Sequence, residues 1–227
     1  MTEVAVIRPG CTDYDAQSRI AGRLDLPLNA AGEAQNADLI DTLRGLHLSY
    51  LLRGAGGNVA ATAEQLGERL DLPVKVTEAL CNLDQGLWEG LTVDDVRRRY
   101  PKLARKWHDE PESVCPPDGE SVGEALDRVR KALSKPLKKG RTFGIVAADP
   151  LATLIESVVL GEAVEFDGPL GQPRRCGSVT VVSTEGSVRE EACVSSLSSE
   201  QLAAVTDVEG EAVVAAGDED MGTTEER

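Results

Sequence analysis

The sequence predicts an α/β fold, a three-layer α/β/α sandwich built around a mostly parallel central sheet. Short apolar runs such as "VAVI" (4–7) and "TFGIVAA" (142–148) alternate with amphipathic segments along the chain. Uninterrupted apolar runs are typical of strands covered on both faces, and helices that connect such strands produce parallel pairing. We therefore expect the functional site at the carboxyl ends of the strands, where residues 8–12 and 148–150 emerge.

The strands are expected where short apolar runs lie between turn residues. Val, Ile and Leu suit a buried pleated surface, and glycine, proline or asparagine marks the turns. The expected strands cover residues 4–7, 46–52, 74–77, 142–148 and 178–183. His47 falls inside the second run, so we expect it to be a packed or edge-strand residue.

The helices are expected where apolar residues recur at helical spacing behind a capping residue. Asn29 and Thr92 are typical N-cap residues, Pro150 stands at a first turn, and Gly45 and Gly161 stand where helices end. The expected helices cover residues 30–44, 59–70, 93–100, 123–135 and 150–160.

We expect one domain followed by a tail. The alternating pattern occupies residues 1–183, and within it residues 78–120 form a long insertion or lid, where His108 is expected at the surface. Residues 184–227 are acidic, rich in small residues and without aromatics. This composition predicts a flexible C-terminal tail, with one short helix around 199–206.

The charge of the chain excludes two classes of partner. The 227 residues carry a formal net charge of −15. Such an excess repels the phosphates of nucleic acids and of anionic membrane surfaces, so we expect neither as a partner. The chain shows no leader and no run of about 20 apolar residues, so we expect a cytoplasmic protein.

The cysteines are odd in number and widely spaced. They are Cys11, Cys81, Cys115, Cys176 and Cys193, and no two form a C-x-x-C pair. This spacing supports neither a disulfide framework nor a zinc site. We therefore expect reduced thiols, with Cys11 as a small buried one, and neither a metal nor a cofactor.

Several segments carry a family resemblance through their order and spacing. They are "VIRPGCTDYDAQSRIAGRLDLPLNAAGEAQ" at the start, then "TAEQL", then "GLWEGLT" with "CPPDGES", and finally "GIVAADPLATLIESVVLG". Together they resemble the histidine phosphatase superfamily, also called the phosphoglycerate mutase-like family, over about residues 3–183.

The resemblance implies phosphoryl transfer through a covalent phosphohistidine. In that chemistry a neutral imidazole attacks phosphorus, two arginines and a second histidine neutralise the oxygens, and a carboxyl group protonates the leaving oxygen. Arg8 matches the first arginine, and Gly10 matches the glycine that lets the backbone approach the ligand. Arg19 matches a position at the mouth in part. These three residues are therefore the expected anion-binding set.

The other positions of this mechanism have lost their chemistry. Pro9 stands at the nucleophile, Asn58 at the second arginine, Asn82 at the acid and Ala148 at the second histidine. Proline offers no lone pair for attack, and asparagine carries neither a positive charge nor a transferable proton. Losing one preorganised donor costs about 10²–10³ in rate, and losing a nucleophile costs on the order of 10⁶. The resemblance thus implies a chain without a phosphohistidine route.

Arg8 keeps its charge at any physiological pH and needs a compensating group. Asp149 follows the position of the lost second histidine, and we expect it to pair with Arg8 in place of the phosphate dianion. The alternative is an Arg8 side chain that is simply solvated. Arg19 and Arg23 are expected either near the mouth or in ion pairs with Asp15 or Asp25.

Two functional classes remain open. The first is a catalytically inactive family member with a binding or regulatory role toward a protein partner, a phosphorylated small molecule or another copy of the chain. Its binding patch would lie on the insertion around Trp88, Tyr100 and Trp107, which are otherwise lid or core residues. The second is a phosphatase-like hydrolase with rebuilt chemistry that activates water through Asp84 or Asp149. A rebuilt enzyme needs ionisable groups that converge on the mouth.

Overall fold

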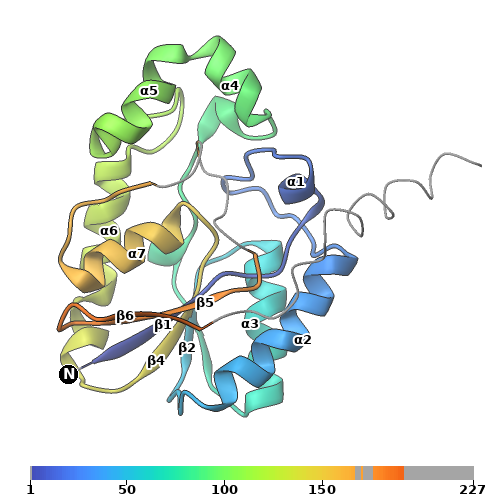
Figure 1. Ribbon diagram of the computed structural model, residues 1–227, viewed down its shortest axis with the longest axis vertical. Helices are drawn as coiled ribbons and strands as arrows, with labels where there is room; N and C mark the ends of the chain where they lie inside the picture. The colour runs from blue at the N-terminus through green and yellow to red at the C-terminus, as the bar shows by residue number, and fades with distance from the viewer. Residues whose placement is uncertain (1, 167–169, 171–175, 192–227) are drawn as a thin grey trace, which may run out of the picture. The chain divides into compact units, whose positions relative to one another are not determined.

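The strands of the computed structural model, which describes residues 2–166, 170 and 176–191, form one mixed sheet (Figure 1). They are β1 (Glu3–Ile7), β2 (Leu51–Arg53), β3 (Val74–Val76), β4 (Phe143–Val146), β5 (Val179–Ser183) and β6 (Val188–Glu191). The order is β3-β2-β4-β1-β5-β6. The pairs β1/β4, β2/β4 and β2/β3 are parallel, and β5 is antiparallel to both its neighbours. The predicted α/β class with a mostly parallel sheet is confirmed.

The helices cover both faces of this sheet. The α-helices are α1 (Asp13–Ala16), α2 (Ala30–Arg44), α3 (Gly57–Leu70), α4 (Val93–Arg99), α5 (Pro101–Asp109), α6 (Val122–Lys138) and α7 (Leu151–Leu160), and the 3-10 turns are η1 (Glu78–Leu80), η2 (Gly86–Trp88) and η3 (Pro111–Ser113). Figure 1 shows α2 and α3 on one side of the sheet and α6 and α7 on the other. No helix in the described part of the chain is long and apolar enough to span a membrane.

Strand β1 runs through the middle of the core. Its side chains alternate between two hydrophobic clusters: Val4 and Val6 pack with α6 and α7, whereas Ala5 and Ile7 pack with α2 and α3. All four side chains are fully buried. This two-sided burial is the reason that the run is apolar without interruption.

The helix caps lie where the sequence placed them. The Asn29 side chain accepts a hydrogen bond from the backbone N–H of Gly32 at 2.9 Å, and α2 ends at Gly45. Thr92 accepts from the N–H of Asp95 at 3.1 Å and so begins α4. Local signals of this kind need no tertiary contact, because donor and acceptor lie within one turn.

The second strand is shorter than predicted. It begins at Leu51 rather than at residue 46, and His47 lies in an exposed turn with φ of +48°. The expectation that His47 is a packed or edge-strand residue is therefore wrong. The apolar run misled the prediction because Leu46 and Leu48 pack against the core from the turn, outside any strand.

The sheet extends beyond the predicted tail boundary. Strand β6 pairs with β5, and Val182 lies opposite Val188 across a turn that contains Gly186 with φ of +83°. The strand was missed because "VREE" lacks an apolar pattern, and an edge strand tolerates such charged residues. Strand β6 thus extends the sheet to Glu191, and the helix expected around 199–206 lies outside the described residues.

The insertion buries its aromatic residues. Trp88 and Trp107 are fully buried, and the Trp107 ring stacks on Phe166 with centroids 4.3 Å apart. Tyr100 is partly buried, and the centroids of its ring and of the Trp88 ring lie 6.0 Å apart. The hypothesis that these rings form an exposed binding patch is therefore wrong, because they form the core of the insertion. His108 is exposed, as predicted.

This packing predicts the effect of truncating one ring. Trp107→Ala should lower the free energy of unfolding by about 3–5 kcal/mol, because a buried aromatic side chain leaves a cavity. Leu87→Ala, in the same insertion but 55% exposed, is the matched control and should change it by less than about 0.5 kcal/mol. Urea denaturation measures both. Equal effects of the two substitutions would contradict the assignment of Trp107 to the core.

Candidate functional site

A cavity of about 40 Å³ lies at the carboxyl ends of the parallel strands. Its lining includes every position that the family resemblance assigns to catalysis, namely Arg8, Pro9, Asn58, Asn82 and Ala148. These residues come from the ends of β1 and β4, from α3 and from the segment after η1. The fold therefore brings all the replaced positions to one place. A cavity of this size holds about two or three water molecules.

The sheet register sets the centre of this cavity. Ile7 of β1 lies opposite Val146 of β4, and the Ala147 N–H donates to the Ile7 carbonyl at 3.0 Å. The chain leaves both strands at the same level, so Arg8 and Asp149 emerge side by side. The Arg8 backbone N–H donates to Ser178 O at 2.8 Å, which ties the same point to the segment before β5.

The Arg8 guanidinium is buried and held by two carboxylates. Its Nε lies 2.9 Å from Asp149 Oδ2, and its Nη1 lies 2.7 Å from Glu156 Oε1. Nη1 also donates to the Thr180 hydroxyl at 3.3 Å, and Nη2 donates to Asp149 Oδ1 at 3.3 Å. All three guanidinium nitrogens thus donate within the protein, and the residue is only 2% exposed.

The partner of Arg8 was foreseen in part. Asp149 lies where the sequence analysis placed it, in contact with Arg8, and the alternative of a solvated Arg8 is wrong. Glu156 was missed, because it is a polar residue on the buried face of the otherwise apolar helix α7. Burial by itself would lower the pKa of Arg8, but Asp149 and Glu156 outweigh it and raise the pKa above its ordinary value. The guanidinium therefore stays charged.

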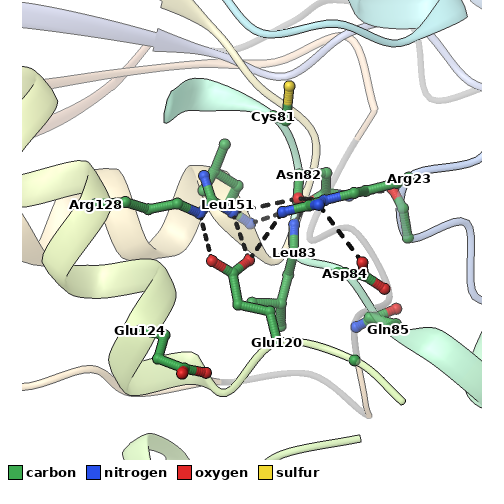
Figure 2. Close-up of polar contacts among 12 residues, drawn as sticks. Arg23, Cys81, Asn82, Leu83, Asp84, Gln85, Glu120, Glu124, Arg128 and Leu151 are labelled. Atoms are coloured by element: carbon green, nitrogen blue, oxygen red, sulfur yellow. Dashed lines mark hydrogen bonds and ion pairs between the residues drawn. The ribbon is translucent and has the colours of Figure 1, made fainter. Parts of the chain in front are cut away.

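Asn82 acts as a tether at the position of the family's acid (Figure 2). Its side-chain N–H groups donate to the carbonyls of Gly22 at 3.0 Å and Asp149 at 3.1 Å. Its Oδ1 accepts from the backbone N–H groups of Leu83 at 2.9 Å and Leu151 at 3.3 Å. The amide is thus fully engaged in holding the turn that carries Asp149.

A second charge network surrounds the backbone of Asn82. Figure 2 shows Arg23 and Arg128 converging on Glu120. Arg23 also lies 3.4 Å from Asp84, and both arginines donate to the Asn82 carbonyl, at 3.1 and 3.3 Å. The suggested pairing of Arg23 with Asp15 or Asp25 is therefore not observed. Asp84 belongs to this network on the insertion side of the cavity.

The expected anion-binding set is largely committed to contacts inside the protein. Arg8 donates to carboxylates, and the Gly10 N–H donates to Asn36 Oδ1 at 3.2 Å. Arg19 lines the cavity, but its Nη1 donates to the Gly90 carbonyl at 2.7 Å. The Gly10 N–H and the buried Arg8 cation, which were expected to bind an anion, therefore already have partners inside the protein.

Arg53 does not replace the charge that the family's second arginine would supply at Asn58. Arg53, the closest arginine in the sequence, lies outside the residues that line the cavity and forms an ion pair of 2.9 Å with Glu64. Asn58 makes a weak contact of 3.5 Å from Nδ2 to the Gly10 carbonyl. The position of Asn58 itself therefore carries no positive charge, although Arg19 and Arg23 line the same cavity.

Two thiols meet at the rim of the cavity. Cys11 and Cys176 lie close to Asp15, and the two sulfurs and a carboxylate oxygen are all within 4.8 Å of one another. A hydrogen bond from the Cys176 thiol lowers the pKa of Cys11, against the opposing effect of burial. The same contact and burial raise the pKa of Cys176. Sequence spacing gave no sign of this meeting, because Cys11 follows β1 and Cys176 precedes β5, far away in the chain.

The fold and the cavity together define an α/β protein whose site opens at the carboxyl ends of β1 and β4. A profile of the histidine phosphatase superfamily (branch 1) matches residues 4–187, and the chain belongs to this family. The family predicted from the sequence motifs is thereby confirmed.

Two curated relatives show the range of names within this family. The chain is 27% identical over 139 residues to phosphoserine phosphatase 1 of Hydrogenobacter thermophilus, and 29% identical over 138 residues to a probable phosphoglycerate mutase of Salmonella arizonae. Each match covers 61% of this chain. It spans 66% and 64% of the two relatives, just under two thirds of their lengths.

Solved structures support the same fold. A mycobacterial glucosyl-3-phosphoglycerate phosphatase in complex with VO3 superimposes with a TM-score of 0.70 at 25% identity, over 83% of this chain and 95% of that one. YhfR of Bacillus stearothermophilus superimposes with a TM-score of 0.71 at 22% identity, over 85% and 100% of the two chains. The second likeness concerns the fold alone.

The buried ion cluster predicts a large effect of removing its cation. Arg8→Met should lower the free energy of unfolding by about 3–5 kcal/mol, because two buried carboxylates lose their counter-charge. Urea denaturation measures this loss. Arg23→Met is the matched control: its ion pairs are partly exposed, so it should cost only about 0–1 kcal/mol.

A triple variant tests the electrostatic origin of that loss. Arg8→Met combined with Asp149→Asn and Glu156→Gln should recover most of the stability, because neutral side chains then replace the whole cluster. A triple variant no more stable than Arg8→Met would show that lost packing, rather than uncompensated charge, causes the effect.

Proposed function

We propose that this chain is a catalytically inactive member of the histidine phosphatase superfamily that acts by binding. The observation that carries the proposal is the contact of Arg8 with Asp149 and Glu156, at 2.9 and 2.7 Å. In the chemistry of the family this arginine neutralises the phosphoryl oxygens. Here two carboxylates of the chain itself occupy its donors, beside Pro9 at the nucleophile position.

Electrostatics opposes a phosphate ester in this cavity. A phosphate near Arg8 would have to displace Asp149 or Glu156 or lie beside them, and like charges 4 Å apart repel by about 4 kcal/mol at an effective dielectric constant near 20. The second arginine, which would offset this repulsion, is replaced by Asn58. We therefore propose that the ligand is not a phosphate ester.

The two carboxylates considered for a rebuilt hydrolase are both engaged in ion pairs. Asp149 is buried against Arg8, and Asp84 pairs with Arg23 in the second network. Neither carboxylate is therefore placed to act on water without breaking a contact with an arginine. We therefore infer a binding or regulatory role through the outer surface, toward a protein partner, since the cavity holds only about two or three waters.

This proposal predicts the absence of phosphatase activity. The purified chain should not hydrolyse p-nitrophenyl phosphate or phosphoserine above background, because loss of the nucleophile costs on the order of 10⁶ in rate. Phosphoserine phosphatase 1 of Hydrogenobacter thermophilus serves as the positive control. Hydrolysis that co-purifies with this chain and disappears in Asp149→Asn would contradict the proposal and point to rebuilt chemistry.

It also predicts that phosphate binding is masked by the two carboxylates. Inorganic phosphate at about 10 mM should leave the melting temperature of the wild type unchanged, whereas it should raise that of the double variant Asp149→Asn/Glu156→Gln, by mass action on the freed Arg8. Thermal denaturation followed by circular dichroism measures both. A phosphate-dependent shift of the wild type that is as large as that of the variant would contradict the masking.

A further inference from the structure

We propose that Cys11, Asp15 and Cys176 form a binding site for a zinc ion at the rim of the cavity. The proposal is independent of the binding role inferred above, because it concerns a metal rather than a protein partner. It rests on the meeting of three side chains from two segments that lie far apart in the chain. Cys11 follows β1, Asp15 lies in α1, and Cys176 precedes β5.

The backbone around the two cysteines is fixed by hydrogen bonds. Beside Cys176, the Gly177 N–H donates to the Pro9 carbonyl at 2.8 Å. The Cys11 N–H donates to Gln35 Oε1 at 2.9 Å, and its carbonyl accepts from the N–H of Asn29 at 3.0 Å. The two thiols are therefore held near each other by the strands and by α2, without any need for a metal.

A close approach confirms how tightly this corner is packed. A Cβ built on Gly32 would lie 2.2 Å from the Cys11 carbonyl oxygen, so only glycine fits on the adjoining face of α2. Gly177 has φ of +62°, which is also a conformation that favours glycine. The backbone at Cys11, and at Gly177 next to Cys176, is thus positioned by the fold.

The third ligand is oriented by the cap of α1. Asp15 Oδ2 accepts hydrogen bonds from the Thr12 N–H at 2.7 Å and from the Thr12 hydroxyl at 2.8 Å. Within the described residues this arrangement holds the carboxylate in place and leaves Oδ1 to serve as a ligand. A carboxylate that is itself hydrogen-bonded is typical of metal ligands, since the outer partner fixes its orientation.

The separations suit a tetrahedral metal. Zinc binds sulfur at about 2.3 Å and carboxylate oxygen at about 2.0–2.2 Å, so tetrahedral ligand atoms lie about 3.5–3.8 Å apart. The three atoms here lie within 4.8 Å of one another. Side-chain movements of about 1 Å would therefore complete the coordination.

The chemistry of the three donor atoms favours zinc over Mg²⁺ and Ca²⁺, and it favours a metal site over a simple disulfide. Two thiolates select zinc-like ions, whereas Mg²⁺ and Ca²⁺ require oxygen ligands. A disulfide would use both sulfurs but would give the Asp15 carboxylate beside them no role beyond the cap of α1. Asp15 and Cys176 also line the cavity. The fourth position would therefore be open to water, as in zinc sites with three protein ligands.

Cobalt spectroscopy of the full chain tests the proposal. The reduced, metal-free protein should bind one Co²⁺ with the near-ultraviolet absorption of thiolate ligands and the visible bands of a tetrahedral site, and zinc should displace the cobalt. Cys11→Ser and Cys176→Ser should each weaken zinc binding by at least about 10–100-fold, the loss that even outer partners of metal ligands cause. Cys115→Ser, an exposed thiol outside the cluster, should bind as the wild type does.

A second pair of variants separates the ligand from the helix cap. Asp15→Asn removes both the ligand and part of the cap, whereas Thr12→Ala removes the cap and keeps the carboxylate. The former should bind zinc more weakly than the latter. Should a variant fail to fold, alkylation of the wild type still decides, because zinc should protect Cys11 and Cys176 but not Cys115 from iodoacetamide.

Three results would overturn the proposal. The first is reduced wild-type protein that binds neither Co²⁺ nor Zn²⁺, which would leave a thiol pair or a disulfide. The second is a bound Co²⁺ without thiolate absorption. The third is binding that persists unchanged in both cysteine variants, which would place the metal elsewhere.

Discussion

The buried contact of Arg8 with Asp149 and Glu156 is the interaction on which the rest of the site depends. Removing a guanidinium from water costs several kcal/mol, and only close, hydrogen-bonded partners offset that cost. Two carboxylates and the Thr180 hydroxyl supply those partners, and Arg8 itself is only 2% exposed. A charge satisfied in this way is paired inside the protein, so one cluster closes this end of the core.

The sheet explains why this cluster exists. Strand β1 lies between β4, which delivers Asp149, and β5, which delivers Thr180, while Glu156 projects from α7 above them. Asn82 then holds the Asp149 turn through its amide. The cavity has thus kept the location of a histidine phosphatase site, although its polar groups now bind one another. The two thiols at the rim of this cavity are the groups for which we propose a new role, the binding of zinc.

Predictions that depend on interactions within one turn of the chain were correct, whereas features that depend on contacts between distant residues were missed or left open. The N-caps at Asn29 and Thr92 were found because a cap is contained within one turn. Strand β6 was missed, since a charged edge strand is defined only by its partner β5. His47 was misassigned because an apolar run does not show where the chain turns. Trp107 was left open between a binding patch and a core, and only packing against Phe166 decided it.

The sequence by itself determined the family and which residues stand at the positions that its motifs assign to catalysis. A motif order survives single replacements, and no fold can give Pro9 a nucleophilic atom or Ala148 a positive charge. The tertiary structure alone decided which groups surround Arg8, with Glu156 as its second partner. It alone also placed Cys11 beside Cys176. Both facts depend on contacts between residues far apart in the chain, which local patterns of residues cannot encode.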